Sequence, residues 1–336
     1  MRLPLPFPRV AWYRKFVRPW LFRLPPELAL RAADRALAVK PFWPLYATVH
    51  RTPRWRNIPM DGVQPRNPVG LAAGLDKQCA YLDSLGHLGF GYVIGGTVTL
   101  NPRPGNPKPR VLRLPERESI INALGFPSVG LDEAARRLEA LRRRPAKVLV
   151  SIAALEDDDT EVCLRRLEPL VSGVELNISS PNTLGVRKYQ QPDALRMLLE
   201  RLNGVRHRPL FIKLPPYMDE VSKENTFALV RVCKEAGVSG ITAINTVPVE
   251  ERKLAMRRGG LSGRSIFRDM LRIIPEIRRE AGPGMVINAC GGISTADDAA
   301  AALDAGADTV QLYSALVYRG PGAVHEIVRG LAERGR

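Results

Sequence analysis

Short apolar runs alternate with amphipathic stretches along most of this chain, from residue 69 onward. Eight runs have the length and composition of buried strands: Val69–Asp76, Tyr92–Thr99, Lys147–Ala154, Gly173–Ser180, Leu210–Pro215, Gly240–Asn245, Val286–Gly292 and Thr309–Ala315. The stretches with helical spacing include Ser128–Arg143, Asp193–Val205, Glu220–Ala236, Ser265–Ala281 and Thr295–Ala305. Near-continuous apolar strands separated by helices indicate a parallel sheet with both faces covered. Eight such units predict an α/β fold, a closed (β/α)8 TIM barrel, with an open doubly wound sheet as the alternative.

The first 50 residues differ, because aromatic residues and arginines share short helical segments there. A first helix ends at Pro25, and Glu27–Val39 predicts a second. Such a pair is typical of an anchor in the membrane interface, or of a helical hairpin packed on the main domain. We expect residues 1–50 to form this extension and residues 51–336 the barrel domain, with a small hairpin between Trp55 and Pro68. The apolar stripe of the first helix consists of Trp12, Phe16, Trp20 and Leu24.

Composition narrows the class of protein. The 336 residues are 45% hydrophobic and 25% charged, as in a folded globular protein. The net charge of +16 favours an anionic partner, although a basic solvated surface would give the same value. The sequence has no RNP box and no paired Cys/His finger, so we expect no nucleic-acid partner. Four scattered cysteines without a CxxC pair argue against a disulfide scaffold or structural zinc, so we also expect no metal.

Polar residues gather where the predicted strands end. In a barrel these ends face one side, and the loops that follow them build the active site. Because the residues come from several strands, they predict a site on that face. They are Lys77, Thr97, Asn177, Ser180, Lys213, Asn245, Thr246, Gly291, Gly292, Tyr313 and Ser314.

The residue types in this cluster suit an anionic, planar ligand. Lys77 and Lys213 supply positive charge, either to an anion or to an electron-accepting ring. Primary amides donate and accept hydrogen bonds, so a converging set suits a ligand with carbonyls, ring N–H groups and a carboxylate. Taken singly, each lysine could be a surface residue and each asparagine a local cap. The amides are Asn122, Asn177, Asn182 and Asn245.

Two glycine-rich segments and one serine extend the prediction. The segments 259–263 and 291–295 each precede a predicted helix, so we interpret them as phosphate cradles. Ser180 lacks the Gly-x-Ser-x-Gly setting of a hydrolase nucleophile, and no histidine lies near a strand end. Acyl transfer is therefore disfavoured, whereas a hydroxyl can still take part in proton abstraction.

Six motifs in a fixed order carry a resemblance to a known family. They are GLAAGLDK at 70–77, GTVT at 96–99, PGNPKPR at 104–110, NISSPNT at 177–183, GLSG at 260–263 and QLYS at 311–314. Together they resemble class 2 (quinone-dependent) dihydroorotate dehydrogenases over nearly the whole chain. Serine at position 180, where class 1 enzymes are expected to carry cysteine, agrees with class 2, as does the N-terminal extension.

The resemblance implies a reaction and its residues. Ser180 is the expected base that removes the C5 proton of dihydroorotate while C6 delivers a hydride to FMN, and a membrane quinone then takes the electrons. It implies a peripheral enzyme of pyrimidine biosynthesis on the cytoplasmic side of the cell membrane, attached through the N-terminal helices. Thr183 and Phe126 match positions on a proton exit path, and Arg110 would face the quinone. The expected FMN contacts are Ala73, Gly74, Lys77, Thr97, Asn177, Lys213, Gly263, Gly292, Tyr313 and Ser314. The expected orotate contacts are Lys77, Asn122, Ala123, Leu124, Gly125, Phe126, Asn177, Asn182, Asn245 and Thr246.

Three departures from the family pattern lie on the flavin side. Ala153 stands where the family has an Asn that touches FMN, Ala123 replaces an Arg, and Ile244 replaces a Thr. The helix after the third strand is expected to be short, from about Asp159 to Leu170. Each lost hydrogen bond weakens FMN binding by about 1 kcal/mol. A working enzyme is the first hypothesis, and a paralogue with another substrate or little catalysis is the alternative.

Overall fold

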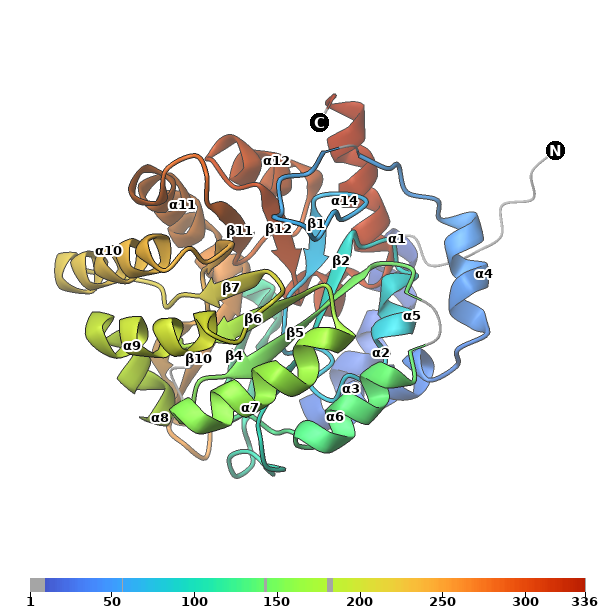
Figure 1. Cartoon of the computed structure of the whole chain (residues 1–336). Helices are drawn as coiled ribbons and strands as arrows, with labels where there is room; N and C mark the ends of the chain where they lie inside the picture. The colour runs from blue at the N-terminus through green and yellow to red at the C-terminus, as the bar shows by residue number, and fades with distance from the viewer. Residues whose placement is uncertain (1–9, 56, 142–143, 180–183, 336) are drawn as a thin grey trace.

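The computed structural model describes residues 10–55, 57–141, 144–179 and 184–335. Eight parallel strands close into a barrel in the order β1-β12-β11-β8-β7-β6-β5-β2, with helices around its outside (Figure 1). The closed barrel confirms the first expectation, and the open-sheet alternative is wrong. The strands are β1 (Val69–Leu71), β2 (Tyr92–Val98), β5 (Lys147–Ala153), β6 (Gly173–Asn177), β7 (Leu210–Lys213), β8 (Gly240–Ala243), β11 (Val286–Cys290) and β12 (Thr309–Leu312).

The surrounding helices form where the apolar spacing predicts them. In α11 the side chains of Met270, Ile273, Ile274 and Ile277 are buried at helical spacing, and the helix ends before Gly282, whose φ of +79° favours glycine. The barrel helices are α5 (Leu82–Gly86), α6 (Leu131–Glu139), α7 (Asp157–Leu167), α8 (Leu184–Arg187), α9 (Pro192–Asn203), α10 (Glu220–Glu235), α11 (Phe267–Ala281), α12 (Ala296–Asp304), α13 (Ser314–Arg319) and α14 (Gly322–Glu333). The 3-10 turns are η2 (Pro115–Arg117), η3 (Glu168–Leu170), η4 (Lys188–Gln190) and η5 (Arg264–Ile266).

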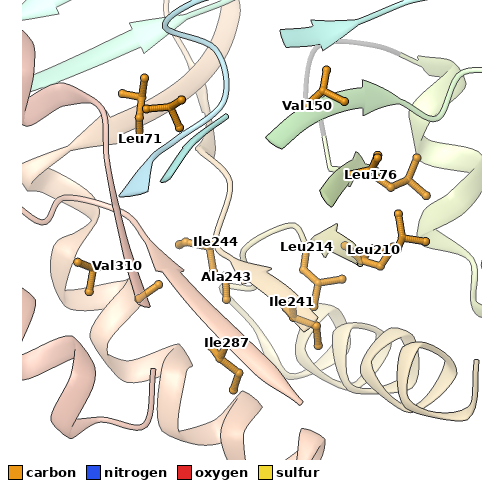
Figure 2. Packing of buried hydrophobic residues seen from close by; sticks show 14 of the residues in the cluster. Leu71, Val150, Leu176, Leu210, Leu214, Ile241, Ala243, Ile244, Ile287 and Val310 are labelled. Carbon is orange, nitrogen blue, oxygen red and sulfur yellow. The ribbon is translucent and has the colours of Figure 1, made fainter. Parts of the chain in front are cut away.

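Buried apolar side chains fall into separate clusters because successive residues of a strand point to opposite faces. The largest cluster joins strands to helices and includes Val150, Leu176 and Ile287 (Figure 2). A smaller one contains Tyr92, Phe211 and other strand residues together with Met60 and Val63, from the segment before β1. The alternation thus separates an outer core beneath the helices from an inner core, and both are closed to water.

The N-terminal extension is helical, as expected, but it has one more helix than the pattern predicts. A continuous helical segment comprises α1 (Val10–Trp12), the π-helical turn η1 (Tyr13–Val17) and α2 (Arg18–Arg23), and α3 (Pro26–Leu37) follows. The additional helix is α4 (Phe42–Val49), whose Trp43 is buried and donates from Nε1 to the Ala36 carbonyl at 3.2 Å. The extension is tied to the barrel by Tyr13, whose hydroxyl donates to the Val317 carbonyl at 2.9 Å. Of the described residues, none lie in a helix both long and apolar enough to cross a membrane.

A second sheet, which the sequence pattern did not predict, lies beside the barrel. It has four antiparallel strands in the order β3-β4-β10-β9. The segment 259–263, interpreted above as a phosphate cradle, lies entirely within strand β10, and of its residues Ser262 and Gly263 line the cavity described below. The segment after Trp55 turns back as the expected hairpin would, with the Trp55 backbone N–H donating to the Arg66 carbonyl at 2.8 Å, but its described residues up to Pro68 contain no strand. The strands are β3 (Val111–Leu114), β4 (Ser119–Asn122), β9 (Val247–Glu250) and β10 (Arg258–Gly263).

Candidate active site

One cavity of about 840 Å³ joins the barrel to the N-terminal helices. Residues at the carboxyl ends of six barrel strands line one part of it: Thr97, Asn177, Lys213, Ile244, Cys290 and Gln311. The N-terminal segment lines another part with Trp12, Tyr13, Val17, Leu21, Phe22 and Leu30. A single space therefore has a polar end in the barrel and an apolar end between the helices.

A chain of hydrogen bonds joins three strand ends on the barrel side. Asn177 donates from Nδ2 to Thr97 Oγ1 at 3.4 Å, and its Oδ1 accepts from both the backbone N–H (3.1 Å) and the hydroxyl (3.3 Å) of Ser179. The Ser179 hydroxyl in turn accepts from Asn245 Nδ2 at 2.9 Å. Asn245 also fixes the next residue, because its Oδ1 accepts from the Thr246 backbone N–H at 2.7 Å. Two of the four amides that we expected to converge, Asn177 and Asn245, are thus held in place by the protein itself.

Two predicted residues of this segment, Ser180 and Asn182, lie outside the described residues, as does Thr183. Ser179, which the sequence reasoning passed over, is buried and bridges the two amides. Its position directly before Ser180 in a polar run was the only available signal. The structure therefore describes the segment 177–183 only as far as Ser179.

Lys213 is a buried cation at the barrel end of the cavity. It is only 5% exposed and lines the cavity from the last position of β7. Burial acts to lower the pKa of the Lys213 ammonium, but the Cys290 sulfur and the Glu175 carboxylate act in the opposite direction, and the net pKa lies above its ordinary value. Lys213 therefore presents a permanent positive charge to a ligand in the cavity.

The second lysine, Lys77, lies on the loop after β1 and also lines the cavity. Its Nζ donates to the Gly74 carbonyl, so the side chain folds back over its own loop. The Gly74 carbonyl accepts from the Tyr313 hydroxyl as well, at 3.4 Å, which joins this loop to the end of β12. Ala73 and Gly74 complete this wall of the cavity.

Glycines allow close backbone approach on the side formed by the loops after β10 and β11. A Cβ on Gly292 would lie 2.6 Å from the Gly263 carbonyl oxygen and 2.8 Å from Phe267 Cβ, and the φ of Gly292 is +72°. Gly263, with a φ of +91°, and Ser314, the first residue of α13, line the same region of the cavity. Backbone N–H groups at such turns and helix starts suit an anion.

Only some residues at the end of β4 and in the segment after it line the cavity. Asn122, Leu124, Gly125 and Phe126 line it. Ala123 does not, and that expectation is corrected: it is fully buried in a cluster with Ile121 and Leu254. Its backbone N–H donates to the Arg110 carbonyl at 2.9 Å, so Ala123 positions the loop that carries Arg110.

Ala153 and Ile244, two positions that depart from the family pattern, are both buried. Ala153 is buried beside Asn177 in the β5–β6 register and is not among the residues that line the cavity. Ile244 lines the cavity, yet its side chain belongs to the outer core (Figure 2). The helix after β5 begins at Asp157, two residues earlier than expected, and its helical course ends at Leu170 through η3.

Comparisons with known proteins point to one family over most of the chain. The family described as "Dihydroorotate dehydrogenase" matches residues 58–334. A protein of Chloroflexus aurantiacus named "Dihydroorotate dehydrogenase (quinone)" is 38% identical over 352 residues, which cover 95% of this chain and 96% of that protein. A protein of the same name from Xanthomonas campestris is 36% identical over 341 residues, covering 94% and 95%. A crystal structure of DHODH from Eimeria tenella in complex with ferulenol has a TM-score of 0.76 at 27% identity and covers 92% of this chain and 91% of that one.

Proposed function

The chain belongs to the dihydroorotate dehydrogenase family, and we propose that it oxidises dihydroorotate to orotate with FMN as cofactor and a membrane quinone as acceptor. It is an oxidoreductase, and the activity belongs to pyrimidine biosynthesis. The observation that carries the proposal is the single cavity, which joins a cluster of amides and a buried lysine to an apolar space between the N-terminal helices. Both relatives bear the name of the quinone-dependent enzyme, which favours this activity over the paralogue alternative.

The residues that are present fit FMN. When bound, FMN supplies the two-electron acceptor that takes a hydride from one substrate and later reduces another. Lys213 offers a buried positive charge to the electron-accepting ring, and Thr97 and Asn177 offer hydrogen bonds beside it. Ala73, Gly74, Lys77 and Tyr313 would form the neighbouring wall. Backbone N–H groups around Gly263, Gly292 and Ser314 suit the phosphate.

The substrate carries a carboxylate, ring carbonyls and ring N–H groups, so it needs a cation and several amides. Lys77 supplies the positive charge, and Asn177 and Asn245 are already oriented by Ser179. Asn122 and Thr246 line the same part of the cavity, with Leu124, Gly125 and Phe126 nearby. Asn182 completes the proposed set on the strength of the family motif.

Ser180 is the proposed base for the C5 proton of the substrate. The motif NISSPNT carries this assignment, and Thr183 and Phe126 would line the path by which the proton leaves. A serine hydroxyl is a weak base on its own, so the proposal requires that the proton be relayed onward. Removal of water from the cavity by the apolar neighbours would assist that transfer.

Quinone would enter from the apolar end of the cavity. Arg110 lines the cavity there and offers a charged donor to a quinone oxygen. Trp20 is 68% exposed and Phe16 is 50% exposed, and Arg14 and Lys15 lie in the same helical segment. Apolar rings beside basic residues suit the interface of an anionic membrane. These residues support peripheral attachment to the membrane surface, and the cytoplasmic side is proposed from the family resemblance alone.

Colour tests this function directly. Protein loaded with FMN should be yellow and should bleach when dihydroorotate is added without oxygen, and addition of a quinone should restore the colour. A yellow protein that dihydroorotate cannot bleach would indicate another substrate. A protein that cannot be loaded with FMN would overturn the proposal altogether.

A further inference from the structure

Glu175 is a fully buried carboxylate inside the barrel to which the proposed reaction gives no role. It lies in β6, two residues before Asn177, and is 0% exposed. Its Oε2 accepts from the Thr242 hydroxyl at 2.8 Å, and among the described residues its Oε1 accepts no hydrogen bond. An ionised carboxylate is costly to bury unless a positive charge or several donors compensate it. One hydrogen bond is a small compensation, so a nearby cation would stabilise the ionised form.

A polarised row of hydrogen bonds ends on this carboxylate. Thr309 donates its only hydroxyl proton to Asn288 Oδ1 at 2.6 Å, so the Tyr92 hydroxyl, 2.7 Å from Thr309 Oγ1, must be the donor in that pair. The Asn288 amide donates to the Thr242 hydroxyl oxygen at 3.4 Å, and Thr242 donates to the carboxylate. Every member thus donates toward Glu175, and such a row stabilises an acceptor that carries negative charge.

Lys213 is the buried cation beside this carboxylate. In the parallel register Thr242 pairs with Lys213, and Lys213 pairs with Asn177. Thr242 and Lys213 therefore lie side by side on the same face, and Thr242 holds the carboxylate. The titratable groups that act on Lys213 are Cys290 of β11 and Glu175 of β6.

Of these two neighbours, the Cys290 thiol carries no charge at neutral pH. Burial raises the pKa of the Cys290 thiol above its ordinary value, so the thiol stays protonated and neutral. Glu175 is then the negative charge that opposes the effect of burial on the Lys213 ammonium.

We propose that Glu175 is a positioning residue that keeps Lys213 charged and fixed at the barrel end of the cavity, where FMN would bind, while the row from Tyr92 to Thr242 holds the carboxylate in place. The proposal rests on the function above, because Lys213 acts on FMN only if FMN binds there. A fixed cation at the ring stabilises the negative charge that the flavin takes up on reduction. Without its buried counter-charge, the same lysine would lose its proton within the working pH range.

The test is the midpoint potential of the bound flavin as a function of pH. In a plot of midpoint potential against pH, the slope should change where Lys213 loses its proton. In Glu175→Gln this break should move to lower pH by about one to three units. The break should disappear when Lys213→Met is added. Cys233→Ser, at a buried thiol of α10 that does not line the cavity, should leave it unchanged, and Glu175→Asp should keep most of the wild-type profile. A purely structural role for Glu175 would lower stability without creating a break that depends on Lys213.

Two results would overturn the proposal. One is a Glu175→Gln profile that superimposes on the wild-type profile. The other is a displaced break that persists after Lys213→Met. If the protein binds no FMN, the proposed function fails, and the same variants are compared by unfolding without flavin. The loss of unfolding free energy caused by Glu175→Gln should then become smaller as the pH rises through the lowered pKa of Lys213. Adding Lys213→Met should remove this pH dependence. If the pH dependence is absent, or if it persists with Lys213→Met, Glu175 does not have the proposed role.

Discussion

The Arg110 guanidinium donates from Nε to the Glu27 carboxylate over 2.8 Å and so joins a barrel loop to helix α3. Lys108 Nζ lies 2.7 Å from the other oxygen of the same carboxylate. Nη1 of Arg110 also donates to the Pro104 carbonyl at 2.7 Å, which fixes the plane of the guanidinium. Glu27 therefore orients the residue that we propose for quinone binding.

Replacing Glu27 by Gln should weaken quinone use and spare flavin reduction. The partly exposed ion pair contributes about 1 kcal/mol, so the KM for quinone should rise roughly fivefold. The rate at which dihydroorotate bleaches the flavin should not change, because Glu27 lies in the N-terminal part of the cavity wall. Steady-state assays and anaerobic stopped flow measure the two quantities. Glu333→Gln, at an exposed carboxylate of α14, is the control, and an equal loss in both half-reactions would contradict the assignment.

The same carboxylate should make the attachment of α3 sensitive to acid. Burial raises the pKa of Glu27, but hydrogen bonds from Lys108 and Arg110 lower it more, and the net pKa lies below its ordinary value. A lowered pKa adds stability above the unfolded-state value of about 4.3, and this stability is lost as the pH falls through the folded-state value. Limited proteolysis of the N-terminal helices should therefore accelerate below about pH 4. Glu27→Gln should remove the pH-dependent part of this acceleration.

A methyl group at Gly292 should damage both the fold and FMN retention. At a φ of +72°, the added Cβ would meet the Gly263 carbonyl oxygen at 2.6 Å. Gly292→Ala should cost at least about 1 kcal/mol of stability and release FMN during gel filtration. Gly284→Ala is the matched control, because a Cβ there meets nothing within 4 Å. Thermal unfolding and the ratio of FMN to protein check both effects, and normal FMN content in Gly292→Ala would exclude this turn from the flavin site.

The barrel could be predicted from the sequence because each of its strands is a near-continuous apolar run, buried on both faces. The second sheet could not, since its strands of four to six residues share no apolar pattern, and VPVE in β9 mixes charged, proline and apolar residues. Helix α4 was missed because Pro44 lies two residues after its start, where proline is tolerated in a first turn. Short elements stabilised by tertiary contacts leave little periodic signal.

Within the site, residues that end a strand could be predicted, whereas residues one layer deeper could not. Glu175 and Asn288 are ordinary polar positions in sequence, and only the closed barrel brings them into one row. The motif also misled at Ala123, which supports the Arg110 loop instead of lining the cavity. Ile244 packs its side chain into the outer core, so its loss of a hydroxyl relative to the family pattern affects the cavity less than the sequence suggested.

Replacing two exposed aromatic residues of the first helical segment should weaken membrane attachment. Phe16 and Trp20 are 50% and 68% exposed, and each would gain about 1.5–3 kcal/mol on burial in lipid. The double change Phe16→Ser and Trp20→Ser should weaken binding to anionic phospholipid vesicles by at least about tenfold. Met197→Ser with Val221→Ser removes exposed apolar residues from α9 and α10 and should leave vesicle binding intact. Equal losses in the two double variants, measured by vesicle sedimentation, would place the contact elsewhere.

Two adjacent serines should affect the reaction differently. Ser180→Ala should keep the flavin spectrum and slow flavin reduction by dihydroorotate about 10²–10⁴-fold, because the proposed base is lost. Ser179 holds Asn177 and Asn245 by hydrogen bonds of 3.3 and 2.9 Å, so Ser179→Ala should mainly weaken substrate binding. Stopped-flow reduction at several dihydroorotate concentrations separates the limiting rate from the dissociation constant. If Ser180→Ala leaves the limiting rate unchanged, the base is another group; if both variants lower only that rate, the amides do not depend on Ser179.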